Sequence, residues 1–211
     1  MSLLRFVICC VAFTVAAQGA ASAGPAASSE MNFMRVHGQA LPPFGFVNFC
    51  RRHRKECSQL AASSLARFNA TPARLSQLDV INRRVNARVK PVTDMELYGR
   101  EEHWAFPGNQ GDCEDYVVLK RRTLMQLGWP ASALLITVVL DEQGEGHAVL
   151  TARTKQGDYI LDNKVNDVRN WKQTPYQYLM RQSYLNPKIW MALDPRLHRG
   201  APNVAGLVAP K

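Results

Sequence analysis

Residues 111–163 decide the fold of this chain: GDCEDYVVLKRRTLMQLGWPASALLITVVLDEQGEGHAVLTARTKQGDYILDN. The first part predicts a helix from Cys113 to Leu127, because its apolar residues recur on one helical face. Gly128 followed by Pro130 supplies the stop signal. Cys113 is therefore expected at the N-terminus of a helix.

Three β-strands are predicted after this helix, separated by turns that contain glycine. They span residues 134–140, 147–153 and 158–163. Strands joined by such short turns pair as an antiparallel meander. The segment therefore predicts an α+β fold in which a helix packs on an antiparallel sheet.

The flanking segments predict further helices. Thr71 is a capping residue and Pro72 suits the first helical position, so a helix is expected from there to Lys90. Residues 50–68 are expected to be helical at least in part, and residues 176–182 to form a short helix.

The N-terminus has the features of a secretory signal peptide. Arg5 gives it a positive charge, residues 6–17 form a short apolar run, and Ala21-Ser22-Ala23 supplies small residues for cleavage after Ala23. A retained membrane anchor needs about 20 apolar residues, and this run ends at Gln18. Residues 1–23 are therefore expected to be removed on export, and the mature chain is expected to lack a transmembrane segment.

The mature chain is expected to fold as one domain. Residues 24–43 are rich in small residues, glycine and proline, and are expected to form a flexible segment. The domain is expected over residues 44–195, and residues 196–211 are expected to form a loose tail.

The charge balance is basic, with a net charge of +9. The basic residues are scattered or lie in short runs without a nucleic-acid recognition motif around them, so we expect no nucleic-acid partner. An exported basic protein more often meets acidic polymers, anionic membrane surfaces or acidic proteins.

Three cysteines remain after removal of the signal peptide. Cys50 and Cys57 are close in sequence and can form a disulfide in an oxidising compartment, which leaves Cys113 as a free thiol. No second cysteine or histidine lies at zinc-ligand spacing from Cys113. The remaining interpretations of Cys113 are a small buried hydrophobic residue or a nucleophile.

A helix N-terminus favours the thiolate that a nucleophilic cysteine needs, and its N–H groups can stabilise an oxyanion. The candidate base is His147 and its candidate orienting group is Asp162. A two-residue turn at Lys155-Gln156 or Gln156-Gly157 puts both side chains on one face of the sheet as diagonal neighbours, whereas a three-residue turn does not. Taken singly, His147 could be a core histidine and Asp162 a turn residue.

Carboxylates crowd the cysteine at Asp112, Glu114 and Asp115. Their charges raise the pKa of a neighbouring thiol and oppose thiolate formation. Acidic residues are also favoured in the first turn of any helix. The functional alternative is a hard cation, calcium above all, held by these oxygens.

Three separated motifs resemble the bacterial transglutaminase-like cysteine proteinase family. They are Gly111–Tyr116, Gly146–Leu150 and Asp158–Asn163, and the resemblance extends from about Phe44 to Leu193. It implies a papain/transglutaminase-like fold. It also implies a catalytic triad with Cys113 as nucleophile, His147 as general base and Asp162 as orienting carboxylate.

The best-studied branch of that family consists of calcium-dependent periplasmic proteases that cleave a large surface adhesin and release cells from biofilm. An inner-membrane receptor for cyclic di-GMP sequesters the protease in those systems. The calcium ligands of that branch correspond to Asp112 and Glu114. The resemblance thus implies a periplasmic protein with calcium as cofactor and a protein substrate.

Two other functions remain open on the sequence. One is a transglutaminase or amidase, in which an amine replaces water as acceptor, because the same triad supports both reactions. The other is an envelope binding module without catalysis. Trp104, just before the nucleophile, is a candidate wall of the substrate groove or a packed aromatic residue.

Overall fold

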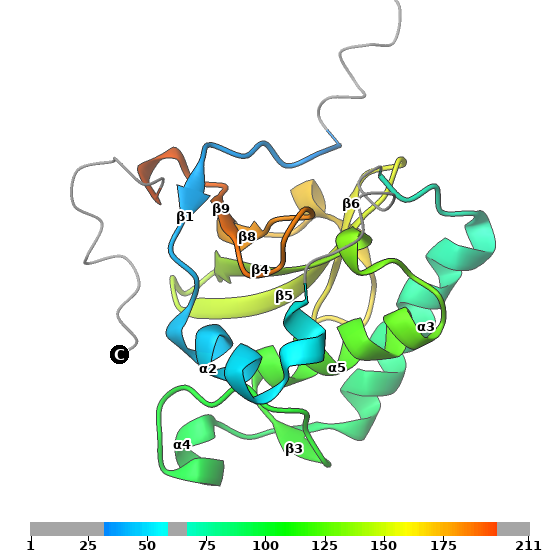
Figure 1. Ribbon diagram of the computed structural model, residues 1–211. Coiled ribbons are helices and arrows are strands. Elements are labelled where there is room, and N and C mark those ends of the chain that lie inside the picture. The colour runs from blue at the N-terminus through cyan, green and yellow to red at the C-terminus, as the bar shows by residue number, and fades with distance from the viewer. Residues whose placement is uncertain (1–31, 59–66, 198–211) are drawn as a thin grey trace, which may run out of the picture.

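The computed structural model describes residues 32–58 and 67–197. A seven-stranded antiparallel sheet has the strand order β1-β9-β8-β4-β5-β6-β7, and three helices lie on one side of it (Figure 1). The strands are β1 (Gln39–Ala40), β4 (Leu134–Leu140), β5 (Gly146–Arg153), β6 (Asp158–Leu161), β7 (Arg169–Asn170), β8 (Gln177–Gln182) and β9 (Trp190–Ala192). The helices on that side are α2 (Phe44–Arg52), α3 (Pro72–Arg88) and α5 (Cys113–Gln126).

Short elements connect these layers. A parallel pair, β2 (Lys90–Pro91) with β3 (Gln110–Gly111), flanks the short helix α4 (Asp94–Tyr98). The 3-10 helices are η1 (Arg54–Cys57), η3 (Ala131–Ala133), η4 (Trp171–Gln173) and η5 (Pro195–Leu197).

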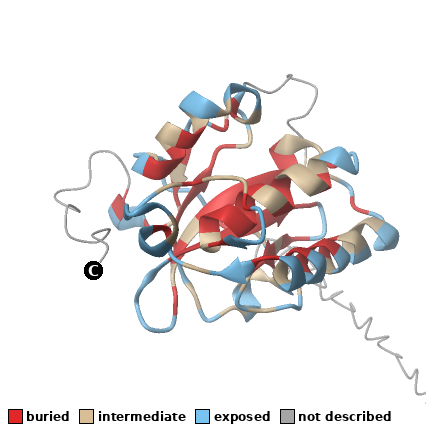
Figure 2. Cartoon of the chain, turned by 90° about the horizontal axis from the view of Figure 1, so that it is seen from below, coloured by how far each residue is buried: buried red, intermediate tan, exposed pale blue. Residues whose placement is uncertain are grey.

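The two faces of the sheet bury different side chains. In β5, Ala148 and Leu150 belong to the large cluster that also contains residues of α2, α3 and α5. Val149 faces a smaller cluster with Ile160 and Tyr178 on the other side. Buried residues accordingly fill the central strands (Figure 2).

The sequence pattern predicts the central elements closely. Helix α5 begins at Cys113, and the helix α3 begins at Pro72 with Thr71 Oγ1 accepting a hydrogen bond from the Arg74 N–H at 3.3 Å. Strands β4, β5 and β6 are sequential neighbours in the sheet. The predicted α+β meander is therefore confirmed.

The β5–β6 hairpin has a two-residue turn, the turn length at which the sequence pattern puts His147 and Asp162 on one face. Arg153 pairs with Asp158, and the Thr154 N–H donates to the Gly157 carbonyl at 3.0 Å, so Lys155 and Gln156 form the turn. This register selects one of the two predicted turns. It puts the position of Asp162 two residues along the ladder from that of His147.

One predicted helix is wrong. Residues 177–182 form strand β8, which pairs with β4 on one side and β9 on the other. Tyr178 and Leu179 face opposite sides of the sheet, and a β-bulge in the pairing with β4 then puts Met180 in the same cluster as Leu179. Short apolar runs do not separate helix from strand by periodicity, and the two neighbouring strands decide the outcome.

The ends of the chain extend beyond the described residues. The expected signal peptide 1–23 lies outside them, as do residues 59–66 and most of the expected tail 196–211. The described part of segment 24–43 contributes β1 to the sheet. Among the helices of residues 32–58 and 67–197, none is long and apolar enough to cross a membrane.

Candidate active site

Cys113 lies at the first position of α5, against the beginning of β5. The Ala148 N–H donates to Cys113 Sγ at 3.4 Å, so the sulfur contacts the backbone one residue from His147. The preceding residue, Asp112, makes no side-chain capping bond to the helix. The N–H of Cys113 is among the first-turn donors that lack an intrahelical acceptor.

His147 and Asp162 meet directly. His147 Nε2 and Asp162 Oδ1 are 2.9 Å apart, and both side chains are buried. The contact follows from the two-residue turn of the hairpin, because that turn puts both side chains on one face. The sequence therefore predicts the pairing of these two residues.

Three further groups hold the Asp162 side chain and backbone. Tyr176 Oη donates to Oδ2 and its ring packs edge-on against His147 at 5.7 Å, while the Lys164 N–H donates to Oδ1 at 2.9 Å. Asn86 of α3 donates to the Asp162 carbonyl at 2.9 Å. Burial raises the pKa of Asp162, but the hydrogen bonds and charge of His147 and the Tyr176 hydrogen bond outweigh it and lower the pKa.

An ionised Asp162 fixes the histidine tautomer. A carboxylate only accepts hydrogen bonds, so Nε2 of His147 carries the proton and donates it to Oδ1. Nδ1 is then the ring nitrogen that can accept a proton. This is the arrangement that a general base needs.

The Cys113 thiol hydrogen-bonds to a neighbouring carboxylate. Cys113 Sγ–H donates to Glu114 Oε2 at 3.1 Å rather than to the imidazole. Burial, followed by the charges of Glu114 and Asp112, raises the pKa of the thiol well above its usual value. Burial and these negative charges therefore both oppose formation of the thiolate.

Three carboxylates form a cluster beside the thiol. Asp94, Asp112 and Glu114 each offer an oxygen, and these oxygens lie within 4.8 Å of one another. Burial raises the pKa of all three groups, that of Asp112 to about 6, and repulsion from the neighbouring carboxylates adds to the shift of Asp112 and Glu114. Among the described residues, Asp94 Oδ1 and Asp112 Oδ1 are buried without a hydrogen-bond partner. Unpartnered buried carboxylate oxygens fit a hard cation.

The sequence comparison identifies the family. Residues 36–197 match the model of the bacterial transglutaminase-like cysteine proteinases, BTLCP. The chain belongs to this family. The α+β architecture is that of a BTLCP transglutaminase-like fold, with the helix of Cys113 packed on the sheet of His147. No curated protein matches the sequence.

Solved structures give a weaker similarity. Calcium-bound LapG of Legionella pneumophila has 23% sequence identity and a TM-score of 0.49, over 63% of this chain and 78% of that one. A second structure, LapG of the same organism, has 23% sequence identity and a TM-score of 0.49, over 59% of this chain and 71% of that one. The EGTA-treated form of LapG has 22% sequence identity and a TM-score of 0.49, over 66% of this chain and 77% of that one. The BTLCP assignment rests on the family model.

Two BTLCP site residues here were not predicted from the sequence. Asp94 opens α4, where Thr93 and Glu96 form a capping box that could have signalled the helix. Its proximity to Asp112 depends on tertiary packing. Tyr176 has no local signal, because its role is visible only when β8 is placed beside β4.

Two residues that the sequence suggested for the site, Trp104 and Asp115, have other contacts in the structure. Trp104 is 3% exposed, packs edge-on against Phe46 at 5.5 Å and donates from Nε1 to Glu102 at 3.0 Å. The groove-wall interpretation of Trp104 is therefore wrong. Asp115 Oδ1 accepts from the Ala105 N–H at 2.6 Å, so it holds the loop before the nucleophile.

Proposed function

We propose that this BTLCP protein is an exported cysteine endopeptidase that uses Cys113, His147 and Asp162. The support is one geometric observation. His147 and Asp162 share a buried hydrogen bond of 2.9 Å. Ala148, which follows His147, donates its N–H to Cys113 Sγ. The bond leaves Nδ1 as the proton acceptor. Family membership makes a peptide the substrate class.

The reaction has two halves. Cys113 transfers its proton to His147 Nδ1, and Sγ attacks the carbonyl carbon of the scissile peptide bond. His147 then gives the proton to the departing amine, which leaves a thioester on Sγ. In the second half, His147 takes a proton from water, the hydroxide attacks the thioester, and the carboxylic acid product leaves as the thiol is restored.

The N-terminus of α5 can stabilise the negative charge that forms in both halves of the reaction. The N–H of Cys113 lacks an intrahelical acceptor and is the candidate donor to the oxyanion. The positive end of the α5 dipole favours the thiolate as well. Asp162 stabilises the imidazolium that forms in between, without taking its proton.

Calcium is the proposed cofactor, held by Asp94, Asp112 and Glu114. When bound, it would neutralise the carboxylate charges that raise the pKa of Cys113. Calcium takes about six to eight oxygen ligands, so three carboxylates leave room for other oxygens. Glu114 also accepts the thiol hydrogen bond, so its binding to a cation would free the thiol for His147.

The proposed location is the periplasm, after cleavage of residues 1–23. The proposed substrate is a large surface adhesin whose cleavage ends biofilm attachment, and the proposed regulator is an inner-membrane receptor for cyclic di-GMP. Both follow from the resemblance of the three motifs to the adhesin-cleaving branch of the family.

The test compares cells that carry the wild-type chain with cells that carry Cys113→Ser. Surface and secreted proteins are identified by mass spectrometry, with and without a calcium chelator. The expected result is a large protein fragment released only by the wild type and only with calcium. Equal release from both strains would refute the protease assignment, and incorporation of a labelled amine without cleavage would show a transglutaminase instead.

A further inference from the structure

Exposed apolar and basic side chains lie on α2 and on the segments next to it. Phe44 is 72% exposed and Leu41 is 67% exposed. Arg51 lies seven residues after Phe44, two helical turns further on the same face. The opposite face of α2 packs into the core through Gly45, Phe46 and Phe49.

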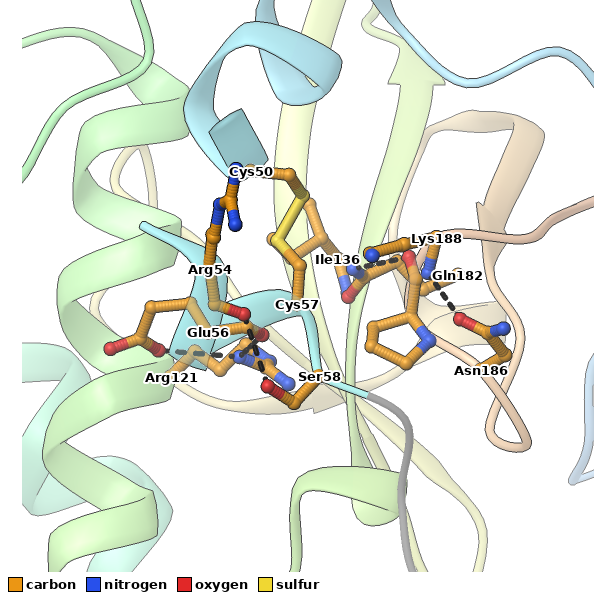
Figure 3. Close-up of a disulfide and its surroundings, with 11 residues drawn as sticks. Cys50, Arg54, Glu56, Cys57, Ser58, Arg121, Ile136, Gln182, Asn186 and Lys188 are labelled. Atoms are coloured by element: carbon orange, nitrogen blue, oxygen red, sulfur yellow. Dashed lines mark hydrogen bonds and ion pairs between the residues drawn. A yellow bond between two sulfur atoms is a disulfide. The ribbon is translucent and has the colours of Figure 1, made fainter. Parts of the chain in front are cut away.

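A disulfide ring that is rich in basic residues includes the end of α2 and the segment that follows it. Cys50 at the end of α2 bonds to Cys57 at the end of η1, and the ring between them reads CRRHRKEC (Figure 3). Glu56 is the one acidic residue in it. Its carboxylate pairs with Arg122 at 2.8 Å and Arg121 at 3.6 Å, so it does not face the ring's own cations.

The basic residues of the ring are therefore uncompensated. Arg51, Arg54 and Lys55 are exposed, and none has a carboxylate partner within residues 32–58 and 67–197. Arg52 is different, because it donates to the Trp104 carbonyl at 2.6 Å and serves the fold. A stabilising interaction with the helix dipole accounts for Arg51 alone. The helix dipole does not explain why Leu41 and Phe44 are exposed near three cations that have no carboxylate partner among the described residues.

We propose that Leu41, Phe44, Arg51, Arg54 and Lys55, the α2 surface, dock this protein on an anionic phospholipid bilayer. Apolar side chains that enter the interface beside cations that meet anionic headgroups are the chemistry of peripheral membrane binding. The disulfide limits the backbone freedom of the ring that carries these cations, so less backbone entropy is lost on binding. An acidic protein is the other class of partner that would match these charges, and the vesicle experiment separates the two.

Vesicle sedimentation tests the proposal. The chain is expressed from its full-length sequence in a bacterial host and recovered as the host processes it. It is then mixed with phosphatidylcholine vesicles that contain or lack phosphatidylglycerol. We expect binding only with phosphatidylglycerol, and weaker binding as salt is added. Each neutralised basic residue costs about a factor of five, so the triple variant Arg51→Gln, Arg54→Gln, Lys55→Gln should bind about 100-fold more weakly.

The chain offers a matched control. Arg84, Arg88 and Lys90 are also exposed, and their triple change to Gln removes the same charge from a different part of the molecule. The affinity of this control for the vesicles should fall by less than about fivefold. The affinity of Phe44→Ser should fall about tenfold, although its net charge is unchanged. Circular dichroism and thermal unfolding check that each variant is folded.

Two results would overturn the proposal. One is absence of wild-type binding to phosphatidylglycerol vesicles, whether or not an acidic protein is captured. The other is an equal loss of vesicle affinity in the two triple variants, which would mean that the net charge of the protein, and not the α2 surface, drives binding. Binding does not depend on the protease chemistry, so Cys113→Ser should bind vesicles like the wild type.

Discussion

Lys120 is a buried lysine on helix α5, and its replacement should stabilise the protein. The side chain has no exposed surface, and within the described residues its Nζ has no hydrogen-bond partner. The centroid of the Tyr116 ring is 5.6 Å from Nζ. Burial lowers the pKa of Lys120 to about 7, and the charge of nearby Asp162 offsets only part of this.

The size of the effect follows from linkage. The ordinary pKa of lysine is 10.5, so the folded state binds fewer protons than the unfolded state between about pH 7 and pH 10.5. Stability therefore rises with pH across this window, and the full penalty applies below pH 7. A shift of this size corresponds to about 4 kcal/mol of folding free energy at pH 7 and about 2 kcal/mol at pH 9.

The assay is urea unfolding of Lys120→Met at both pH values. Methionine has a similar length and no charge, so the free energy of unfolding should increase by about 4 kcal/mol at pH 7 and by about half of that at pH 9. The control is Lys188→Met, an exposed lysine, which should change stability by less than about 0.5 kcal/mol. No gain at pH 7, or an equal gain at both pH values, would refute the reasoning.

Other predictions concern the active site and the disulfide. Tyr176→Phe removes the hydrogen bond to Asp162 but keeps the ring, so kcat/KM should fall about tenfold without loss of the fold; an unchanged value would show that the bond is dispensable. Asp94→Asn should weaken calcium binding, measured by calorimetry, at least about tenfold, and equal affinity would exclude Asp94 as a ligand. The double change Cys50→Ser, Cys57→Ser opens an eight-residue ring and should cost about 2.5 kcal/mol in urea unfolding; no change would mean that the ring is constrained without the bond.

The sequence predicts those parts of the site that follow from local rules. The helix that begins at Cys113 follows from apolar spacing and stop residues. The contact of His147 with Asp162 follows from the length of one turn, since a two-residue turn fixes which side chains share a face. Such features need no knowledge of distant segments.

The remaining parts depend on contacts between distant segments. Asp94 joins the carboxylate cluster because the β2–β3 pair brings α4 back to the start of α5. Tyr176 reaches Asp162 because the following residues form a strand, where periodicity alone predicted a helix. Trp104 lies in the loop that leads to Cys113, yet it is packed against Phe46. Proximity in sequence therefore does not assign a residue to the site.

The rate of alkylation of Cys113 shows whether His147 activates its thiol. Cys50 and Cys57 are bonded to each other, so iodoacetamide labelling can be followed by mass spectrometry on the peptide that contains Cys113. With excess calcium near neutral pH, the wild type should react at least about ten times faster than His147→Ala, because the imidazole removes the thiol proton. Equal rates for the two proteins would contradict the account, since the thiol would then be independent of the histidine.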